Sequence, residues 1–275
     1  ILVGSNFITN KVTCSTNIFK ISTSLAGGFG TKYNSSKIDK TYARIDSCAT
    51  PGYFTDKNNS SLAGGTFETD SWATIISNVK SGQTCMYKVG DTKSVSVGTY
   101  GTHTVRISNM STPSECSKSN FSQTACGFVL EFADIITSYK VNDTDTYKGG
   151  WPACKMRTFV NNDIYNALPS DLKSGIINTK VITGHGSADS QNLTSTDNLY
   201  LLSTAEVWEN GTSNEIKYDT ARDVSIQLDY YKQMGTTTNN YSAAAKKMNS
   251  GGYIWRLRTA WSFNPDSVYG VERSG

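Results

Sequence analysis

Aromatic and charged side chains that can contact a ligand are concentrated in residues 255–275 of the sequence. Aromatic residues and arginines alternate there with small residues, which is typical of interface hot spots and paratopes. We predict a recognition surface formed by Arg256, Arg258, Trp261, Phe263, Asn264, Asp266, Tyr269, Glu272 and Arg273. Asn264-Pro265-Asp266 is a turn signal, so Trp261 and Phe263 are expected to be exposed. We assign Trp255, Leu257 and Val271 to the core.

The six cysteines are more suited to disulfides than to a metal. They are Cys14, Cys48, Cys85, Cys116, Cys126 and Cys154, with no Cys-x-x-Cys pair and two histidines to complete a site. Cys116 and Cys126 enclose a short polar loop and are predicted to pair. Exclusion then gives Cys14 with Cys48 and Cys85 with Cys154. Reduced, buried cysteines in a cytosolic chain are the alternative.

Residues that could catalyse a reaction are present but not in a recognisable arrangement. His185 lies between two glycines, so we interpret it as a turn residue rather than as a general base. Carboxylates for glycoside cleavage could come from Glu131, Asp134, Asp163, Asp197 or Glu206, although helix caps and solvated positions explain most of them more simply. The sequence therefore favours a binding protein over an enzyme.

Oxygen ligands for calcium are also scattered. Asp189, Asp197, Asn198 and Asp266 have suitable side chains but form no regularly spaced loop. Turns and caps are the favoured interpretation, so we predict no cofactor, with calcium as the alternative.

Composition narrows the class of partner. Only 18% of the 275 residues are charged, the formal net charge is +3, and the basic residues form no stripe, which argues against nucleic acid. Ser, Thr, Asn, Gly and Tyr dominate the polar residues, as in secreted proteins and paratopes. No run approaches the length of a membrane span, and the start Ile1-Leu2-Val3-Gly4 suggests processing. We therefore expect an extracellular or cell-surface location.

The chain is expected to contain two parts. Residues 1–65 alternate β-type runs, such as 17–22 and 41–46, with glycine-rich loops, and predict a small β-rich arm or module. Residues 66–275 form the larger domain. Its first element is a predicted helix over 71–81, capped by Asp70 or Ser71 and ended by Gly82.

Helices and strands are intermixed in the larger part. Strands are predicted at 93–97, 103–107, 128–136, 199–202 and 253–258. Helices are predicted at 156–172 with a break at Pro169, at 204–208 and at 219–234. There is no regular strand–helix–strand alternation, so the predicted fold class is α+β.

Three blocks of the sequence carry a family resemblance. They are Gly149–Pro152 with Met156–Asn162 and Tyr165–Pro169, then Thr196–Ser203 with Glu206–Trp208, and finally Trp255–Thr259 with Tyr269–Val271 and Ser274–Gly275. With these blocks, residues 66–275 resemble a bacterial domain family of unassigned function found in surface and secreted proteins. That family is related to the C-type-lectin-like fold of formylglycine-generating enzymes and phage tropism determinants.

The resemblance implies a C-type-lectin-like domain with a binding function. The reactive cysteines of formylglycine-generating enzymes lie late in their fold, whereas the last cysteine here is Cys154, so that activity is not carried over. The family shows a second tryptophan where this chain has Arg256, and a closing strand after the Ser-Gly at which this sequence ends. A truncated sequence or a strand supplied by a neighbouring subunit would account for the missing strand. In related receptors the C-terminal region is diversified by retroelement mutagenesis.

Three functions are weighed. The leading hypothesis is an adhesin or receptor-type protein that binds a host, bacterial or phage surface protein or glycan. The second is a self-assembling subunit of a surface fibre or pilus, completed by its neighbour. The third is a hydrolase of surface glycans, which needs two carboxylates facing one cleft.

Overall fold

The computed structural model describes residues 1–58, 65–209, 216–249 and 251–275. They form two compact units, Ile1–Lys88 and Val89–Gly275. This division differs from the boundary expected at residue 65, because residues 66–88 are joined to the N-terminal unit by covalent and polar contacts. Cys48 is disulfide-bonded to Cys85, and its backbone N–H donates to Gln83 Oε1 over 2.9 Å.

The described part of the N-terminal unit before residue 66 contains little regular structure. Its strands β1 (Leu2–Val3) and β2 (Thr55–Asp56) form one parallel pair, and η1 (Lys40–Tyr42) is a single 3₁₀ turn. The prediction of a β-rich module is therefore wrong. Asn17 has a positive φ of 62°, and hydrogen bonds from Lys20 N to Asn17 O and from Ser22 N to Phe19 O close successive turns where a strand was expected. Phe19 and Ala43 of these runs instead join Tyr53 and Phe54 in a core cluster.

A buried carboxylate organises the loops of this unit. Asp46 accepts hydrogen bonds from the backbone N–H groups of Phe29 (2.9 Å), Thr31 (3.0 Å) and Gly52 (3.0 Å), and from the Thr31 hydroxyl (2.6 Å). A Cβ atom at Gly27 would lie 2.3 Å from Asp46 Oδ2, so only glycine fits at that position. The glycine-rich segment 26–30 thus wraps around the carboxylate.

The first long helix is α1 (Trp72–Lys80), which confirms the helix predicted over 71–81. The Ser71 hydroxyl caps it by accepting a hydrogen bond from Thr74 N, and Gly82 follows with a positive φ of 69°. Trp72 and Ile75 are the predicted apolar residues that it buries.

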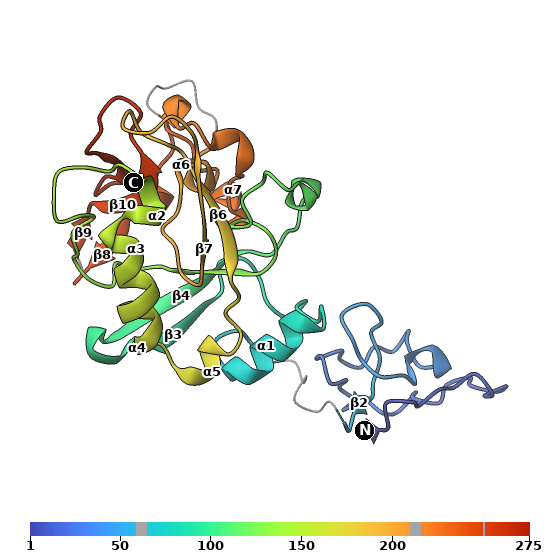
Figure 1. The fold of residues 1–275 in the computed structure, drawn as a ribbon. Helices are drawn as coiled ribbons and strands as arrows, with labels where there is room; N and C mark the ends of the chain where they lie inside the picture. Colours follow the sequence, from blue (N-terminus) through green and yellow to red (C-terminus); the bar gives the residue numbers. More distant parts are fainter. Residues whose placement is uncertain (59–64, 210–215, 250) are drawn as a thin grey trace. The chain divides into compact units, whose positions relative to one another are not determined.

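The described residues of the C-terminal unit form four small antiparallel sheets (Figure 1). The predicted meander is present as β3 (Thr92–Ser96), β4 (Thr102–Asn109) and β5 (Val129–Phe132). The other sheets are pairs: β6 (Thr179–Thr183) with β7 (Leu193–Asp197), β8 (Lys246–Met248) with β9 (Gly251–Tyr253), and β10 (Trp255–Ala260) with β11 (Val268–Val271).

Helices are short and lie between these sheets. They are α2 (Gly150–Ala153), α3 (Lys155–Phe159), the π-helical turn η5 (Val160–Ile164), α4 (Tyr165–Ala167), α5 (Ser170–Lys173), α6 (Thr204–Val207) and α7 (Asp229–Gln233). The 3₁₀ turns are η3 (Gly98–Tyr100), η4 (Ser114–Ser117), η6 (Ile216–Tyr218), η7 (Arg222–Val224) and η8 (Ser242–Ala244). Helix α2 contacts both β7 and β10, and α3, η5 and α4 continue from it as one column (Figure 1). This mixture of helices and antiparallel sheets confirms the α+β class.

Two elements predicted in the C-terminal unit are not regular. The expected helix over 219–234 is reduced to η7 and α7, because backbone groups between them bond to other segments. Val224 O accepts from Ser122 N (2.8 Å) and Leu228 N donates to Glu206 O (3.0 Å). The expected strand at 199–202 is an irregular segment in which Leu199 N donates to the Asn161 side chain.

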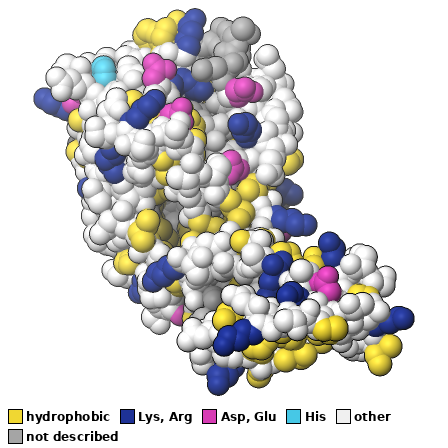
Figure 2. Space-filling model, turned by 90° about the vertical axis from the view of Figure 1, so that its right-hand side faces the viewer, with side chains coloured by type: hydrophobic (Ala, Val, Ile, Leu, Met, Phe, Trp, Pro, Cys, Tyr) yellow, Lys and Arg dark blue, Asp and Glu magenta, His cyan; other side chains and the backbone are white. Residues whose placement is uncertain are grey.

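Surface charge on the C-terminal unit is dispersed. On the face that Figure 2 shows, its Lys and Arg side chains are spread among polar and backbone atoms rather than joined in a stripe. Within the described ranges, no helix has the length and apolar character needed to cross a membrane.

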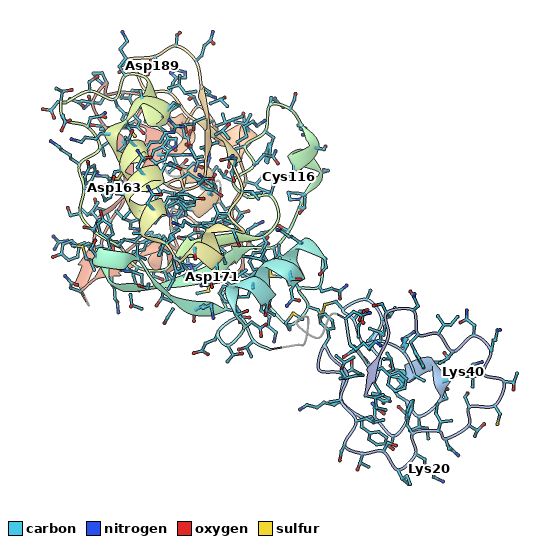
Figure 3. All side chains as sticks on the ribbon, turned by 60° about the horizontal axis from the view of Figure 1, so that its bottom comes forward. Lys20, Lys40, Cys116, Asp163, Asp171 and Asp189 are labelled. Atoms are coloured by element: carbon cyan, nitrogen blue, oxygen red, sulfur yellow. A yellow bond between two sulfur atoms is a disulfide. The ribbon has the colours of Figure 1, made fainter. Side chains whose placement is uncertain are left out.

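The disulfide pattern is partly as predicted. Cys116 and Cys126 are bonded, in a loop at the margin of the C-terminal unit (Figure 3). The pairs Cys14–Cys48 and Cys85–Cys154 are wrong, because Cys48 is bonded to Cys85. Cys154 is a buried thiol at the junction of α2 and α3, where its sulfur accepts from Arg157 N, and Cys14 is an exposed thiol.

Candidate recognition surface

The nine predicted ligand-binding residues separate into buried and exposed groups. Arg258 and Tyr269 are buried, at 0% and 8% exposure, which removes them from any accessible surface. Tyr269 lies in the core cluster that also contains Trp255, Leu257 and Val271, the three residues correctly assigned to the core. Arg256, Phe263, Asp266, Glu272 and Arg273 are exposed, and Trp261 and Asn264 are partly buried.

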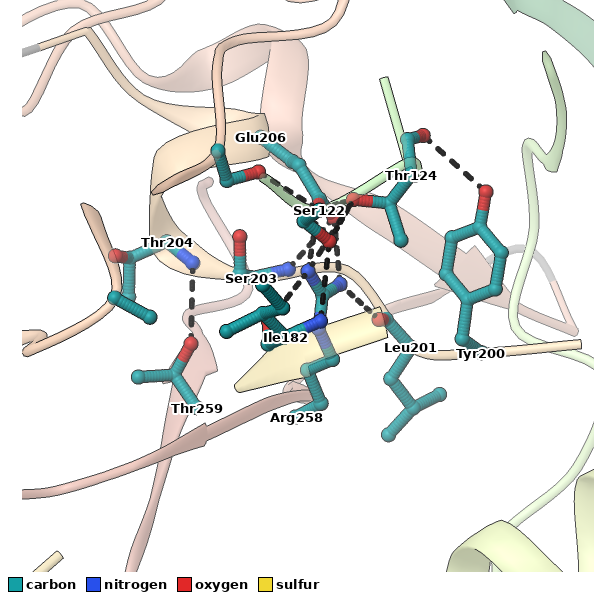
Figure 4. A network of polar contacts seen from close by, with 12 residues as sticks. Ser122, Thr124, Ile182, Tyr200, Leu201, Ser203, Thr204, Glu206, Arg258 and Thr259 are labelled. Carbon is teal, nitrogen blue, oxygen red and sulfur yellow. Dashed lines mark hydrogen bonds and ion pairs between the residues drawn. The ribbon is translucent and has the colours of Figure 1, made fainter. Parts of the chain in front are cut away.

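Arg258 lies in a buried polar network instead (Figure 4). Its guanidinium forms a two-pronged ion pair with Glu206, in which NH1 lies 2.7 Å from Oε2 and NH2 contacts Oε1. NH1 also donates to Leu201 O over 2.6 Å. Glu206 accepts further hydrogen bonds from the hydroxyls of Thr124 and Ser225 and from Ser203 N. Burial alone would raise the pKa of Glu206, but the charge of Arg258 outweighs it and lowers that pKa.

A second buried cluster surrounds Glu131. Its carboxylate accepts from Arg106, Lys246, the Tyr231 hydroxyl (2.7 Å) and the Ser108 hydroxyl (2.6 Å). Burial would raise the pKa of Glu131, but the charges of Lys246 and Arg106 lower it to about 2. Glu131 and Glu206 are therefore both ionised and fully engaged by protein groups.

The other candidate carboxylates do not converge on a site either. Asp197 is buried and bonded to Arg157 and Trp151, while Asp163 is exposed on the helical column (Figure 3). Asp189 accepts from Gly149 N (2.8 Å), and Asp266 is exposed in the C-terminal loop. Within the part of the chain that the structure describes, no three His, Cys, Asp or Glu side chains are grouped to hold a metal. His185 is a loop residue, as predicted.

Three aromatic rings meet at the surface in what we call the aromatic ridge, formed by Tyr218, Trp261 and Phe263. The Phe263 ring packs edge-to-face on Tyr218 at 4.5 Å between centroids and on Trp261 at 6.4 Å. Phe263 is 61% exposed and Tyr218 is 40% exposed. The exposure predicted for Phe263 is thus confirmed. The exposure predicted for Trp261 is wrong, because Trp261 is half-buried and its ring packs against that of Phe263.

Tyr218 was not predicted from the sequence. It comes from η6, forty-three positions before Trp261 in the chain, and no local pattern distinguishes it from the other tyrosines. The Nζ atom of Lys217 lies 4.8 Å from the centre of the Tyr218 ring and places a cation beside the ridge.

Hydrogen bonds brace the loop that carries Trp261 and Phe263. Trp261 N donates to Ser267 O (2.9 Å), Asn264 N donates to Trp261 O (3.2 Å), and Asp266 N donates to Asn264 Oδ1 (3.2 Å), which confirms the predicted turn. Tyr147 N donates to Pro265 O over 2.7 Å and anchors the tip. At the base of the loop, Gly186 packs against the backbone of Trp261. A Cβ atom at position 186 would lie 3.2 Å from Trp261 O, which is a tight contact.

Trp261 of the ridge and its neighbour Ser262 carry hydrogen-bonding groups without a partner among the described residues. These groups, the indole Nε1 of Trp261 and the hydroxyl of Ser262, are buried. Buried polar groups of this kind are uncommon in native structures and are found at functional sites.

The sequence blocks that carry the family resemblance meet in the structure as polar pairs. Arg157 and Trp151 of the first block bond to Asp197 of the second, over 2.6 and 2.9 Å. Glu206 of the second block pairs with Arg258 of the third. These motif residues position the elements of the fold rather than a ligand.

Comparison with known proteins gives one relationship. No curated protein and no solved structure matches the chain. A family model described as a domain of unknown function, DUF6273, matches residues 128–275, which include all three of the blocks above. Because this match covers more than half of the 275 residues, the chain belongs to the DUF6273 family.

Proposed function

We propose that this protein is an extracellular ligand-binding protein of the adhesin type, and that the aromatic ridge is its recognition surface. The single observation that carries the proposal is the exposed edge-to-face cluster of Phe263, Tyr218 and Trp261 on a loop held by hydrogen bonds. Rigid aromatic side chains supply large contact areas and lose little conformational entropy on binding. A prearranged loop lowers the cost of association further.

The residues around the ridge suit a polar partner without a strong net charge. Lys217 and the exposed Asp266 add charge of both signs, and Asn264 adds an amide. Aromatic faces with neighbouring hydrogen-bonding groups suit both a protein surface and a glycan. We therefore propose a surface protein or glycan as the partner.

An extracellular location is supported by the two disulfides, one in each unit. Disulfides persist in oxidising compartments and are rare in reducing ones. The finer assignment of a C-type-lectin-like fold to the C-terminal unit remains our proposal. It rests on the sequence resemblance and is compatible with the observed mixture of short helices and antiparallel sheets.

The burial and ion pairing of the candidate carboxylates favour a binding function over glycan hydrolysis. Hydrolysis requires one carboxyl that can give up a proton and one free carboxylate across a cleft. Glu131 and Glu206 are buried and ionised in ion pairs, and Asp197 is bonded to Arg157. None of the three is available to a substrate.

The test compares the binding of a variant that lacks two ridge residues with that of a control variant that lacks an exposed tyrosine elsewhere. Fluorescently labelled protein is applied to a glycan array and to bacterial and animal cells, with flow cytometry as the readout. We expect the Phe263→Ala/Tyr218→Ala variant to lose at least about tenfold of the wild-type signal, the effect of removing an interface hot spot. Tyr241→Ala is the control, because Tyr241 is 41% exposed and lies outside the ridge. Unchanged binding by the ridge variant would refute the proposal.

A further inference from the structure

A concave surface lies in the C-terminal unit, and its residues do not belong to the ridge. Its volume is about 320 Å³, within the size range of small-molecule sites. It is formed where the helical column α3–η5 faces the end of β7, with Asn178 contributing from the segment before β6. We call it the amide pocket, because four of its lining residues are asparagines.

The pocket contains a fixed and electrically balanced pair. Asp197 is 2% exposed and accepts from Arg157 Nε (2.6 Å), Trp151 Nε1 (2.9 Å) and the Ser195 hydroxyl (2.6 Å). Arg157 donates in addition to Pro152 O over 3.1 Å. Among the described residues, Arg157 and Asp197 are the charged ones that line the pocket, and their charges cancel.

One of the asparagines holds the wall. Asn161 Nδ2 donates to Arg157 O (3.1 Å) and Leu199 O (2.8 Å), while its Oδ1 accepts from Asn198 N and Leu199 N, both at 3.0 Å. The bonds to Asn198 and Leu199 join the helical column to the segment after β7, and the bond to Arg157 O lies within the column. This wall of the pocket is therefore fixed by the protein's own hydrogen bonds.

The remaining amides are free. The side chains of Asn162, Asn178 and Asn198 make no hydrogen bond with any residue in the described ranges, and the same is true of the hydroxyls of Thr158 and Thr196. Each amide offers two donors and one acceptor, and each hydroxyl offers both functions. Asn198 is partly buried and the other four residues are exposed, so three uncommitted amides and two hydroxyls line the open side of the pocket, opposite the wall that Asn161 fixes.

This chemistry selects a class of ligand. A balanced ion pair gives no preference for an anion or a cation, and the absence of aromatic and aliphatic lining residues disfavours an apolar ligand. Neutral hydroxyl groups both donate and accept, which matches the free amides. We propose that the amide pocket binds a neutral saccharide unit through its hydroxyl groups.

The proposal concerns a site separate from the ridge, so the two can fail independently. Glucose, galactose, mannose and N-acetylglucosamine are titrated into the full ¹⁵N-labelled chain, with side-chain amide signals recorded by NMR. We expect at least one of these sugars to shift the Asn162, Asn178 and Asn198 signals at concentrations up to about 20 mM, as for a weak millimolar site. The Phe263→Ala variant should show the same shifts.

Variants assign the effect to the pocket. Asn162→Ala/Asn178→Ala should weaken that binding at least about tenfold, as loss of two partners to the same ligand implies. Asn166→Ala is the control, since Asn166 is an exposed amide on α4 that does not line the pocket. The inference is overturned if no neutral sugar shifts the three amides, if the double variant binds as tightly as wild type, or if a capped diglycine peptide shifts them in place of the sugars.

Discussion

Asp46 in the N-terminal unit and Arg258 in the C-terminal unit are both buried charged residues, and the groups that bond to them come from different distances along the chain. Asp46 is bonded to backbone N–H groups and one hydroxyl from positions 6 to 17 residues away in the chain. Arg258 is bonded to groups 52 to 134 residues away, including a carboxylate. The N-terminal unit thus uses a charge to arrange neighbouring loops, whereas the C-terminal unit uses charges to join distant segments. Substitution of Asp46 should therefore destabilise only the neighbouring loops, whereas substitution of Arg258 should destabilise the whole C-terminal unit.

The largest effect should come from Arg258→Met. This change leaves the Glu206 carboxylate buried without its cation, which costs roughly 3–5 kcal/mol of unfolding free energy. Arg256→Met is the matched control on the same strand, because Arg256 is exposed and its loss should cost less than about 0.5 kcal/mol. Chemical denaturation followed by tryptophan fluorescence measures both, since four of the five tryptophans lie in the C-terminal unit.

Adding Glu206→Gln to Arg258→Met sharpens this prediction. Removal of the orphaned charge should restore part of the lost free energy. Equal stability of the two single arginine variants would show that Arg258 does not join the segments of the unit.

A smaller and more local effect is expected from Asp46→Ala. Three backbone N–H groups would lose their acceptor, at a cost of roughly 2–3 kcal/mol. Hydrogen exchange read by mass spectrometry should show faster exchange over residues 26–55 and unchanged protection of β3, β4 and β5. Faster exchange throughout residues 89–275 would contradict the contrast between the two units.

A pH effect should be confined to the acid side. The folded-state pKa of Glu131 is lowered from 4.5 to about 2, so its contribution to stability is complete above pH 4.5 and is lost as the pH falls toward 2. We expect the denaturation midpoint of the C-terminal unit to fall in this window, and to fall less steeply in Glu131→Gln. Parallel pH profiles for wild type and variant would count against an ionised Glu131.

Local patterns in the sequence predicted local features of the fold. Ser71 with Gly82 predicts α1, the ten-residue spacing predicts Cys116–Cys126, and Asn264-Pro265-Asp266 predicts the turn that supports Phe263. In each case the structure follows from residues close together in the chain.

The errors arose where distant segments decide the environment. Strand alternation places Arg256 and Arg258 on one face, but β10 is covered on both sides from Leu257 onward, and its register with β11 shifts after Arg256. Arg258 N donates to Leu202 O, so the side chain of Arg258 enters the core and forms its ion pair with Glu206 there. Tyr218 reaches the ridge through tertiary packing alone. Neither the Arg258–Glu206 pair nor the packing of Tyr218 on Phe263 can be predicted from a local sequence pattern.

The central claim is that the aromatic ridge binds a ligand and does not support the core. The most direct measurement compares binding and unfolding for Phe263→Ala in the same preparation, using the cell type or glycan that wild-type protein binds most strongly. We predict that binding falls by at least about tenfold while the unfolding free energy changes by less than about 1 kcal/mol, because Phe263 is 61% exposed. Retained binding, or a loss of stability comparable to that of Arg258→Met, would contradict the account.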